Sequence, residues 1–107
     1  MDNLIAMMEE MGIPFAYDHF AEGESPEPPF ICFLSPGSDN FAADGRVYFK
    51  VRQIHIERYT DEKNPETESW VETVLDGHGI FYDKTEAWIE SEKLYEVLYS
   101  IELEVSQ

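Results

Sequence analysis

Cysteine and basic residues are scarce in this sequence, and each scarcity excludes a class of structure. Cys32 is the only cysteine among the 107 residues, so no disulfide can form within the chain. Its apolar neighbours Ile31 and Phe33 predict a buried thiol. Lysine and arginine number 7 against 23 acidic residues, which gives a net charge of −16 at pH 7. Such a charge repels nucleic acid and anionic membranes and favours basic partners.

Long apolar runs and targeting signals are also missing. No apolar stretch approaches the roughly 20 residues of a membrane span, and the first residues lack the basic and apolar segments of a signal peptide. We therefore expect a protein of the cytoplasm. Hydrophobic residues make up 43% of the chain, enough to fill a modest core at this length. Residues 1–107 are thus predicted to form one domain.

The sequence also lacks recognisable sets of metal-binding residues. His19, His55 and His78 lack the spacing of a zinc site, and only one cysteine is available to help them. Asp39, Asn40 and Asp44 do not follow the spacing of a calcium-binding EF-hand loop.

Two further classes of catalytic site are disfavoured. Asp61, Glu62, Glu66 and Glu68 fit a solvated helix start better than an acid–base pair, which needs a cleft and shifted pKa values. No phosphate-binding glycine loop or nucleophile elbow is present. We therefore expect no enzyme activity, no catalytic residue, no metal and no cofactor.

Apolar periodicity predicts an α+β fold of two helices on one face of a mostly antiparallel sheet of four to five strands. Asn64 and Pro65 are typical of a helix start, and Gly12 and Gly77 of helix ends. The predicted order is α-β-β-β-α-β-β: a helix near 3–11, a weak strand Phe15–Phe20, strands Phe30–Leu34 and Val47–Tyr59, a helix from Pro65 to Gly77, and strands Ile80–Ile89 and Tyr95–Val105. Glu22–Pro29 and Ser35–Gly45 are predicted loops.

Within the two helices, apolar residues predict the buried faces. Leu4, Ile5, Met7, Met8 and Met11 share one broad face of the first helix. The second helix carries an apolar stripe made of Trp70, Val71, Val74 and Leu75.

In the strand Val47–Tyr59, the apolar residues change from odd-numbered to even-numbered positions along the chain. Val47, Phe49 and Val51 share one parity, whereas Ile54 and Ile56 take the other, which places the two sets on opposite faces of a regular strand. Either a bulge near Arg52–Gln53 restores the face, or a long strand buries different faces at its two ends. We favour the long strand, since a strand that overhangs a core can serve assembly.

Four stretches together resemble a known family: Pro29–Phe33, Asn40–Tyr48, Ile56–Glu68 and Ile89–Tyr99. They are similar to the tail terminator proteins of tailed phages and prophages of Gram-positive bacteria, also called tail completion or head–tail joining proteins. The resemblance spans about Pro14 to Leu103. Arg58 stands where an apolar residue is expected, and Asn64 where Asp is expected.

The resemblance implies a structural protein of the virion tail that assembles in the bacterial cytoplasm. Six copies would form a homo-oligomeric ring that closes the tail tube and meets the head connector. Its partners would be further copies of itself, the tail-tube protein and the connector protein, with no direct binding of nucleic acid or membrane.

A ring repeats one heterologous contact, and the charge pattern suggests where that contact lies. No base precedes Arg46, and four bases then fall within one short stretch. We predict that this stretch meets acids of the next copy; the alternative is that the bases pair within their own sheet. The predicted contact residues are Arg46, Lys50, Arg52, Arg58, Glu96, Glu102 and Glu104.

Two other functions stay open. A small acidic protein can act as a DNA mimic that inhibits a DNA-binding enzyme of the host. Another head-completion or tail-tube role in the same gene cluster also fits, and gene order separates it from a terminator.

Overall fold

Within the residues that the structure describes, two helices and five strands form an α+β fold, as predicted. The computed structural model describes residues 2–21, 23, 24, 26–43 and 46–105, with side chains described at 4–21, 23, 24, 26–35 and 52–103. The predicted element order is confirmed: α1 (Asp2–Met11), β1 (Phe15–Tyr17), β2 (Phe30–Ala43), β3 (Arg46–Thr60), α2 (Pro65–Gly77), β4 (Tyr82–Ile89) and β5 (Leu94–Val105).

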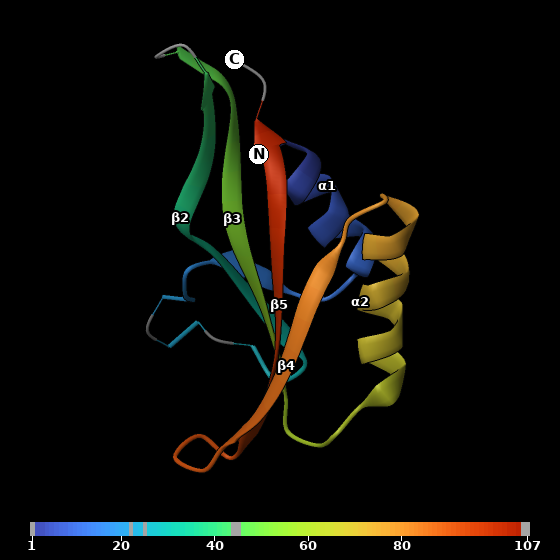
Figure 1. The fold of residues 1–107 in the computed structure, drawn as a ribbon. Helices are drawn as coiled ribbons and strands as arrows, with labels where there is room; N and C mark the ends of the chain where they lie inside the picture. The colour runs from blue at the N-terminus through green and yellow to red at the C-terminus, as the bar shows by residue number, and fades with distance from the viewer. Residues whose placement is uncertain (1, 22, 25, 44–45, 106–107) are drawn as a thin grey trace.

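The five strands form one sheet in the order β1-β2-β3-β5-β4. Only the β1–β2 pair is parallel; the other three pairs are antiparallel. Both helices lie on the same side of this sheet (Figure 1). We call the opposite side the open face, because no helix of the described part of the chain covers it.

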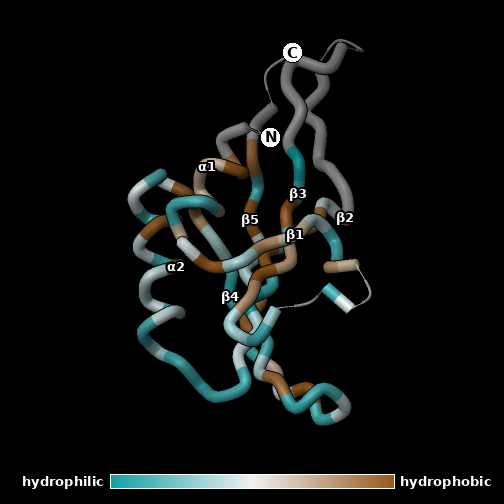
Figure 2. Tube along the Cα trace, turned by 180° about the vertical axis from the view of Figure 1, so that it is seen from behind, coloured by the Kyte–Doolittle hydropathy of each residue, from teal (hydrophilic) through white to brown (hydrophobic). Residues whose placement is uncertain are grey.

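The core lies between the helices and the sheet. Leu4, Met7, Met8 and Met11 of α1 are buried and Ile5 is partly buried, which confirms the predicted face. In the sheet, Ile54, Ile56 and Tyr99 are buried against the helices. Figure 2 shows the matching apolar positions along β3 and β5 beside α1.

The stripe predicted for α2 is right at Val71, Val74 and Leu75 but wrong at Trp70. The first three are buried, whereas Trp70 is 49% exposed. Its indole N–H donates a hydrogen bond to the carbonyl oxygen of Met11 at 3.1 Å, so the ring ties α2 to the end of α1 from the rim of the core.

The predicted helix boundaries are confirmed by their capping contacts. The side chain of Asn64 accepts a hydrogen bond from the backbone N–H of Thr67 at 3.2 Å, and Pro65 occupies the first turn. Gly12 ends α1 with φ of +67°, a conformation that glycine adopts without a steric penalty.

The predicted loop Ser35–Gly45 is wrong, because β2 continues to Ala43. The long strand β3 offers backbone partners along its whole length, and pairing with them outweighs the turn preference of proline, glycine and aspartate here. The register shifts between Leu34 and Gly37, around Pro36. Proline is tolerated at such a position since no strand among the described residues pairs with the outer side of β2 there.

Strand β3 spans the molecule from end to end. At about 3.3 Å per residue, its 15 residues match the longest dimension of the 50 × 29 × 23 Å molecule. Its pairing with β5 runs from Lys50 to Thr60 without a shift, so a bulge at Arg52–Gln53 is absent from this pairing. The strand is long, and its pairing with β5 is regular over this range, whereas its pairing with β2 shifts between Phe41 and Ala42, opposite Phe49 and Val47. Burial of different faces at its two ends stays a prediction, because the side chains of Val47, Phe49 and Val51 lie outside the described ones.

Two strands are shorter than predicted. β1 ends at Tyr17 rather than Phe20, and β4 begins at Tyr82 rather than Ile80. The backbone N–H of Ile80 donates to the carbonyl oxygen of Leu75 at 3.0 Å, so this residue is held by the turn that follows α2 and lies before β4.

Candidate interaction surface

One end of the sheet extends beyond the helices (Figure 1). We call this end of the sheet the extension; it consists of Gly37–Ala43 of β2, Arg46–Gln53 of β3 and Glu102–Val105 of β5. Its β2 and β3 parts reach past the helices, whereas the end of β5 lies beside α1, where Leu103 packs against the core. Among the described side chains of β3, which begin at Arg52, the first buried one is Ile54, and Arg52 is exposed. Within the described residues, no strand pairs with the outer side of β2 beyond Phe33 or with that of β5 beyond Ile101. The extension therefore presents two unpaired strand edges.

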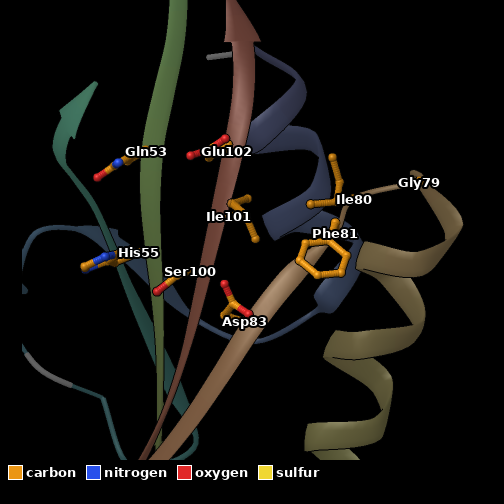
Figure 3. Close-up of a pocket in the computed structure, with 9 residues that line it drawn as sticks. All are labelled: Gln53, His55, Gly79, Ile80, Phe81, Asp83, Ser100, Ile101 and Glu102. Carbon is orange, nitrogen blue, oxygen red and sulfur yellow. The ribbon is translucent and has the colours of Figure 1, made fainter. Parts of the chain in front are cut away.

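A groove of about 650 Å³ lies on the open face at the base of the extension (Figure 3). Phe81, which precedes β4, stands at its rim with 83% of its surface exposed. The groove is acidic at Asp83 and Glu102, and its other polar groups come from neighbouring strands. Its lining residues include Gln53, His55, Asp83, Ser100 and Glu102.

A row of three potentially catalytic side chains crosses this groove but lacks the order of a catalytic triad. His55 pairs with Ser100, and Ser100 pairs with Asp83. A triad needs the histidine between the serine and the acid. Here Ser100 is central, and two strand spacings, about 10 Å, separate His55 from Asp83. The row offers hydrogen-bonding groups to a bound surface.

Acidic side chains crowd the remainder of the open face. Burial raises the pKa of Glu57, and the nearby charge of Glu96 raises it further. Glu96 is half-buried and accepts a hydrogen bond from the hydroxyl of Tyr59 at 2.9 Å. Cys32 is 7% exposed, which confirms the predicted burial, and its pKa is raised by that burial and by Glu57. The thiol is therefore not activated as a nucleophile.

Aromatic rings adjoin the acids of the open face. Phe30 stacks on Tyr59 with ring centres 5.2 Å apart, and Phe20 packs edge-on against Phe30 at 5.6 Å. The open face thus combines carboxylates with apolar rings, a composition suited to contact with another protein.

Arg58 is buried inside the subunit, so its prediction as a contact between copies is wrong. Only 1% of its surface is exposed, because it alternates onto the helix side of β3 under the first turn of α2. Its guanidinium donates to the hydroxyl of Thr67 at 2.5 Å and to the carbonyl oxygen of Asn64 at 3.4 Å. A carboxylate oxygen of Glu68 lies 3.9 Å away.

A polar network extends from this arginine along α2. Lys84 of β4 donates to Glu68 at 2.7 Å and to Glu72 at 2.9 Å. Glu72 also accepts hydrogen bonds from the hydroxyls of Tyr99 and Tyr82, at 2.9 and 3.1 Å. Burial alone would raise the pKa of Glu72, but these hydrogen bonds together hold it below 4.5. Glu68 is thus part of an ion-pair network and not a solvated acid.

The other bases divide into paired and unpaired ones. Lys63 pairs with Glu86 at 2.9 Å, and Lys93 pairs with Glu90. Among the bases with described side chains, Arg52 makes no ion pair and is exposed. The alternative considered for the basic stretch was pairing with acids of the same sheet. Among the described side chains it is found for neither arginine, since the acid beside Arg58 is Glu68 of α2 and Arg52 makes no ion pair.

Several predicted contact residues lie on the extension. Arg46 and Lys50 belong to its β3 part, and Glu104 pairs there with Val51; the side chains of these residues lie outside the described ones. Glu102 is exposed in the groove. Glu96 lies elsewhere, on the open face near the other end of β5. The structure thus collects five of the seven predicted residues on the extension: Arg46, Lys50, Arg52, Glu102 and Glu104.

The remaining candidates for chemistry are scattered. His19 contacts Asp18 at 2.8 Å, and His78 contacts Glu10 at 2.5 Å, both at the surface. The described residues contain no group of three or more potential metal ligands. Asp39 and Asn40 lie in β2, and Asp44 lies outside the described residues.

No family model matches the chain, and no curated sequence matches it. No helix of the described part of the chain is long and apolar enough to cross a membrane. The resemblance to tail-end proteins therefore rests on the four sequence stretches, and the geometry of the extension is independent of it.

Sequence reasoning missed the groove and the two unpaired edges. Both depend on where β1 ends and where β4 begins, and neither boundary has a sharp signal in the sequence. The parity change within β3 was the signal that pointed to this end of the sheet.

Proposed function

We propose that this chain is a structural protein of the tail end of a tailed phage or prophage. Copies form a ring that terminates the tail tube and joins it to the head connector. The observation that carries the proposal is the extension, a part of the sheet whose β2 and β3 strands reach past the helices and which has two unpaired edges. Such a part adds little to its own core, and it is suited to contact with a neighbouring copy.

The charge distribution supports self-association through the extension. The whole chain carries −16, so copies repel one another over most of their surfaces. The extension is neutral by contrast, because three bases balance three acids: Arg46, Lys50 and Arg52 against Asp39, Glu102 and Glu104. Copies that meet through the extension therefore add no like-charge contact to the repulsion between their net charges.

The acidity elsewhere suits a channel for DNA. Phage DNA passes through the tail, and an acidic wall repels its phosphates, so DNA slides without binding. Glutamine substitutions at acids found to face the channel should keep the ring size and slow DNA ejection. Unchanged ejection would contradict this role for the charge.

Assembly on tail tubes tests the proposal directly. The wild-type chain should add to one end of purified tubes and appear as a cap by electron microscopy. Arg46→Glu with Lys50→Glu should leave a folded monomer that forms no ring, since the extension then carries excess negative charge. A matched control, Lys63→Glu with Lys93→Glu, makes the same change at the turns of the opposite end and should still form rings.

A chain that binds no tube end at any salt concentration would overturn the proposal; inhibition of a DNA-binding enzyme by that chain would favour the DNA-mimic function. Normal rings from the Arg46→Glu, Lys50→Glu variant would exclude the extension as the contact and overturn that part of the proposal.

A further inference from the structure

The two unpaired edges of the extension lie at the same position along the strand direction, which we call their height in the sheet. Residues 50–53 of β3 pair on one side with Gly37–Asn40 of β2 and on the other side with Glu102–Val105 of β5. β1 stops at Tyr17, opposite Phe33, and β4 begins at Tyr82, opposite Ile101. Four residues of β2 and four of β5 are thus level with each other, and each set has an outer edge unpaired by any described strand.

These edges are compatible in direction as well as in height. β2 and β5 are both antiparallel to β3, so they run parallel to each other. A rotation about an axis along the strands preserves both direction and height. A second copy placed by such a rotation therefore brings its β2 edge beside the β5 edge of the first copy.

We infer that the sheet continues from one copy to the next, with Gly37–Asn40 of one chain pairing in parallel with Glu102–Val105 of its neighbour. An unpaired strand edge presents backbone N–H and C=O groups that readily accept another strand. The inference rests on the proposed ring and specifies its contact.

A second copy fits these edges better than an unrelated partner. The same chain provides both halves of the contact, with equal length and matching height, on opposite sides of one sheet. A contact between two different surfaces of the same chain is heterologous, and it closes into a ring when the rotation divides the circle evenly. Equal height removes the translation that would otherwise produce an open helix. The neutral charge of the extension allows the two copies to approach.

Engineered cysteines at Asp39 and Glu104 test this contact. Both residues pair with Val51, so the junction places them side by side, about 5 Å apart between Cα atoms, within the range of a disulfide. Within one chain β3 separates them by about 10 Å, too far for a disulfide. A disulfide between them therefore reports only contact between copies.

The experiment uses a Cys32→Ala background, which removes the native thiol. Asp39→Cys and Glu104→Cys chains are oxidised separately and as a mixture, under conditions in which the wild type forms rings by sedimentation. The mixture should give a disulfide-linked dimer, and neither chain alone should give one. A chain with both substitutions should give a covalently closed ring. Replacing Glu104→Cys by Thr85→Cys, on exposed β4 outside the junction, should abolish the dimer.

The outcomes separate this inference from the proposed function. Rings that form without the Asp39–Glu104 disulfide overturn the strand pairing and leave the tail-end function intact. A dimer from the Asp39→Cys chain alone indicates a symmetric contact and also overturns the inference. Absence of rings in the wild type, in solution and on tube ends, overturns both.

Discussion

Two arginines of β3 show how position along one strand decides the role of a side chain. Arg52 and Arg58 have the same parity, so both point toward the helix side of the sheet. Arg58 lies beneath α2 and is buried, whereas Arg52 lies beyond the helices and is exposed. The first is a structural residue of the subunit and the second is available for contact between copies.

The buried arginine should be costly to remove. Arg58→Ala leaves a cavity and deprives Thr67, Asn64 and Glu68 of their partner. We expect the free energy of unfolding to fall by about 3 kcal/mol, measured by urea denaturation. Arg52→Ala is the matched control and should change stability by less than about 0.5 kcal/mol. Equal effects of the two substitutions would contradict the structural role of Arg58.

The cap of α2 offers a second test with a single residue. Asn64→Ala removes the acceptor for the backbone N–H of Thr67 and should cost about 1 kcal/mol in thermal or urea unfolding. Asn64→Asp keeps an acceptor oxygen and adds a charge that the helix N-terminus favours, so it should retain wild-type stability. An equal loss in both variants would show that the side-chain amide, and not the cap, matters.

At the scale of elements, the two sides of the sheet shift carboxylate pKa values in opposite directions. The helix face surrounds Glu72 with donors, and the open face places Glu57 beside Glu96 with partial burial. The pKa of Glu72 is therefore lowered and that of Glu57 raised from the same ordinary value of 4.5.

Glu57 should weaken the folded state at neutral pH. The pKa of Glu57 in the folded chain lies above its ordinary value of 4.5. Between these two pKa values the folded chain binds more protons than the unfolded chain, so the free energy of unfolding falls as pH rises through this range. Glu57→Gln should thus raise the midpoint of urea unfolding at pH 7. The gain should vanish below about pH 4, where both forms are neutral. A loss of stability at pH 7 would contradict this assignment.

Glu72 should show the opposite dependence. Its folded pKa lies below 4.5, so its stabilising contribution is present above that pH and is lost as pH falls through the lowered pKa. Glu72→Gln should lower the midpoint of urea unfolding at pH 7, and the difference from wild type should shrink in acid. A constant difference across this range would indicate a packing effect instead.

The elements were predictable where local chemistry decides them. Asn64, Pro65 and Gly12 mark helix ends by their own conformational preferences, and alternation in Tyr95–Val105 marks a strand. The continuation of β2 through Pro36 and Gly37 was not predictable, because a partner strand that is distant in sequence imposes it. The burial of Arg58 likewise depends on α2, which only the tertiary fold places above it. For the same reason the sequence located the basic stretch but did not separate Arg52 from Arg58.

At the scale of the whole molecule, net charge should govern assembly. Each copy brings −16 into a ring, and this repulsion acts over about 30 Å at 0.01 M salt but only about 3 Å at 1 M. We therefore expect free monomer in dilute buffer and an increasing fraction of rings as salt is raised, measured by analytical ultracentrifugation. The Arg46→Glu, Lys50→Glu variant should stay monomeric throughout. Rings that dissociate as salt increases would contradict an electrostatic barrier.

The reach of β3 beyond the helices also has a consequence for local stability. Backbone hydrogen bonds of the extension lack the cover that helices give to Ile54–Thr60, so they should open without global unfolding, and their amide hydrogens should exchange rapidly with deuterium in the free subunit. Pairing with a neighbour would slow exchange at Gly37–Asn40 and Glu102–Val105 above all. The strand edges that pair in the ring would then lie in the part of the fold with the lowest free energy of local opening. Assembly into the ring would make this part rigid, which a single chain cannot do.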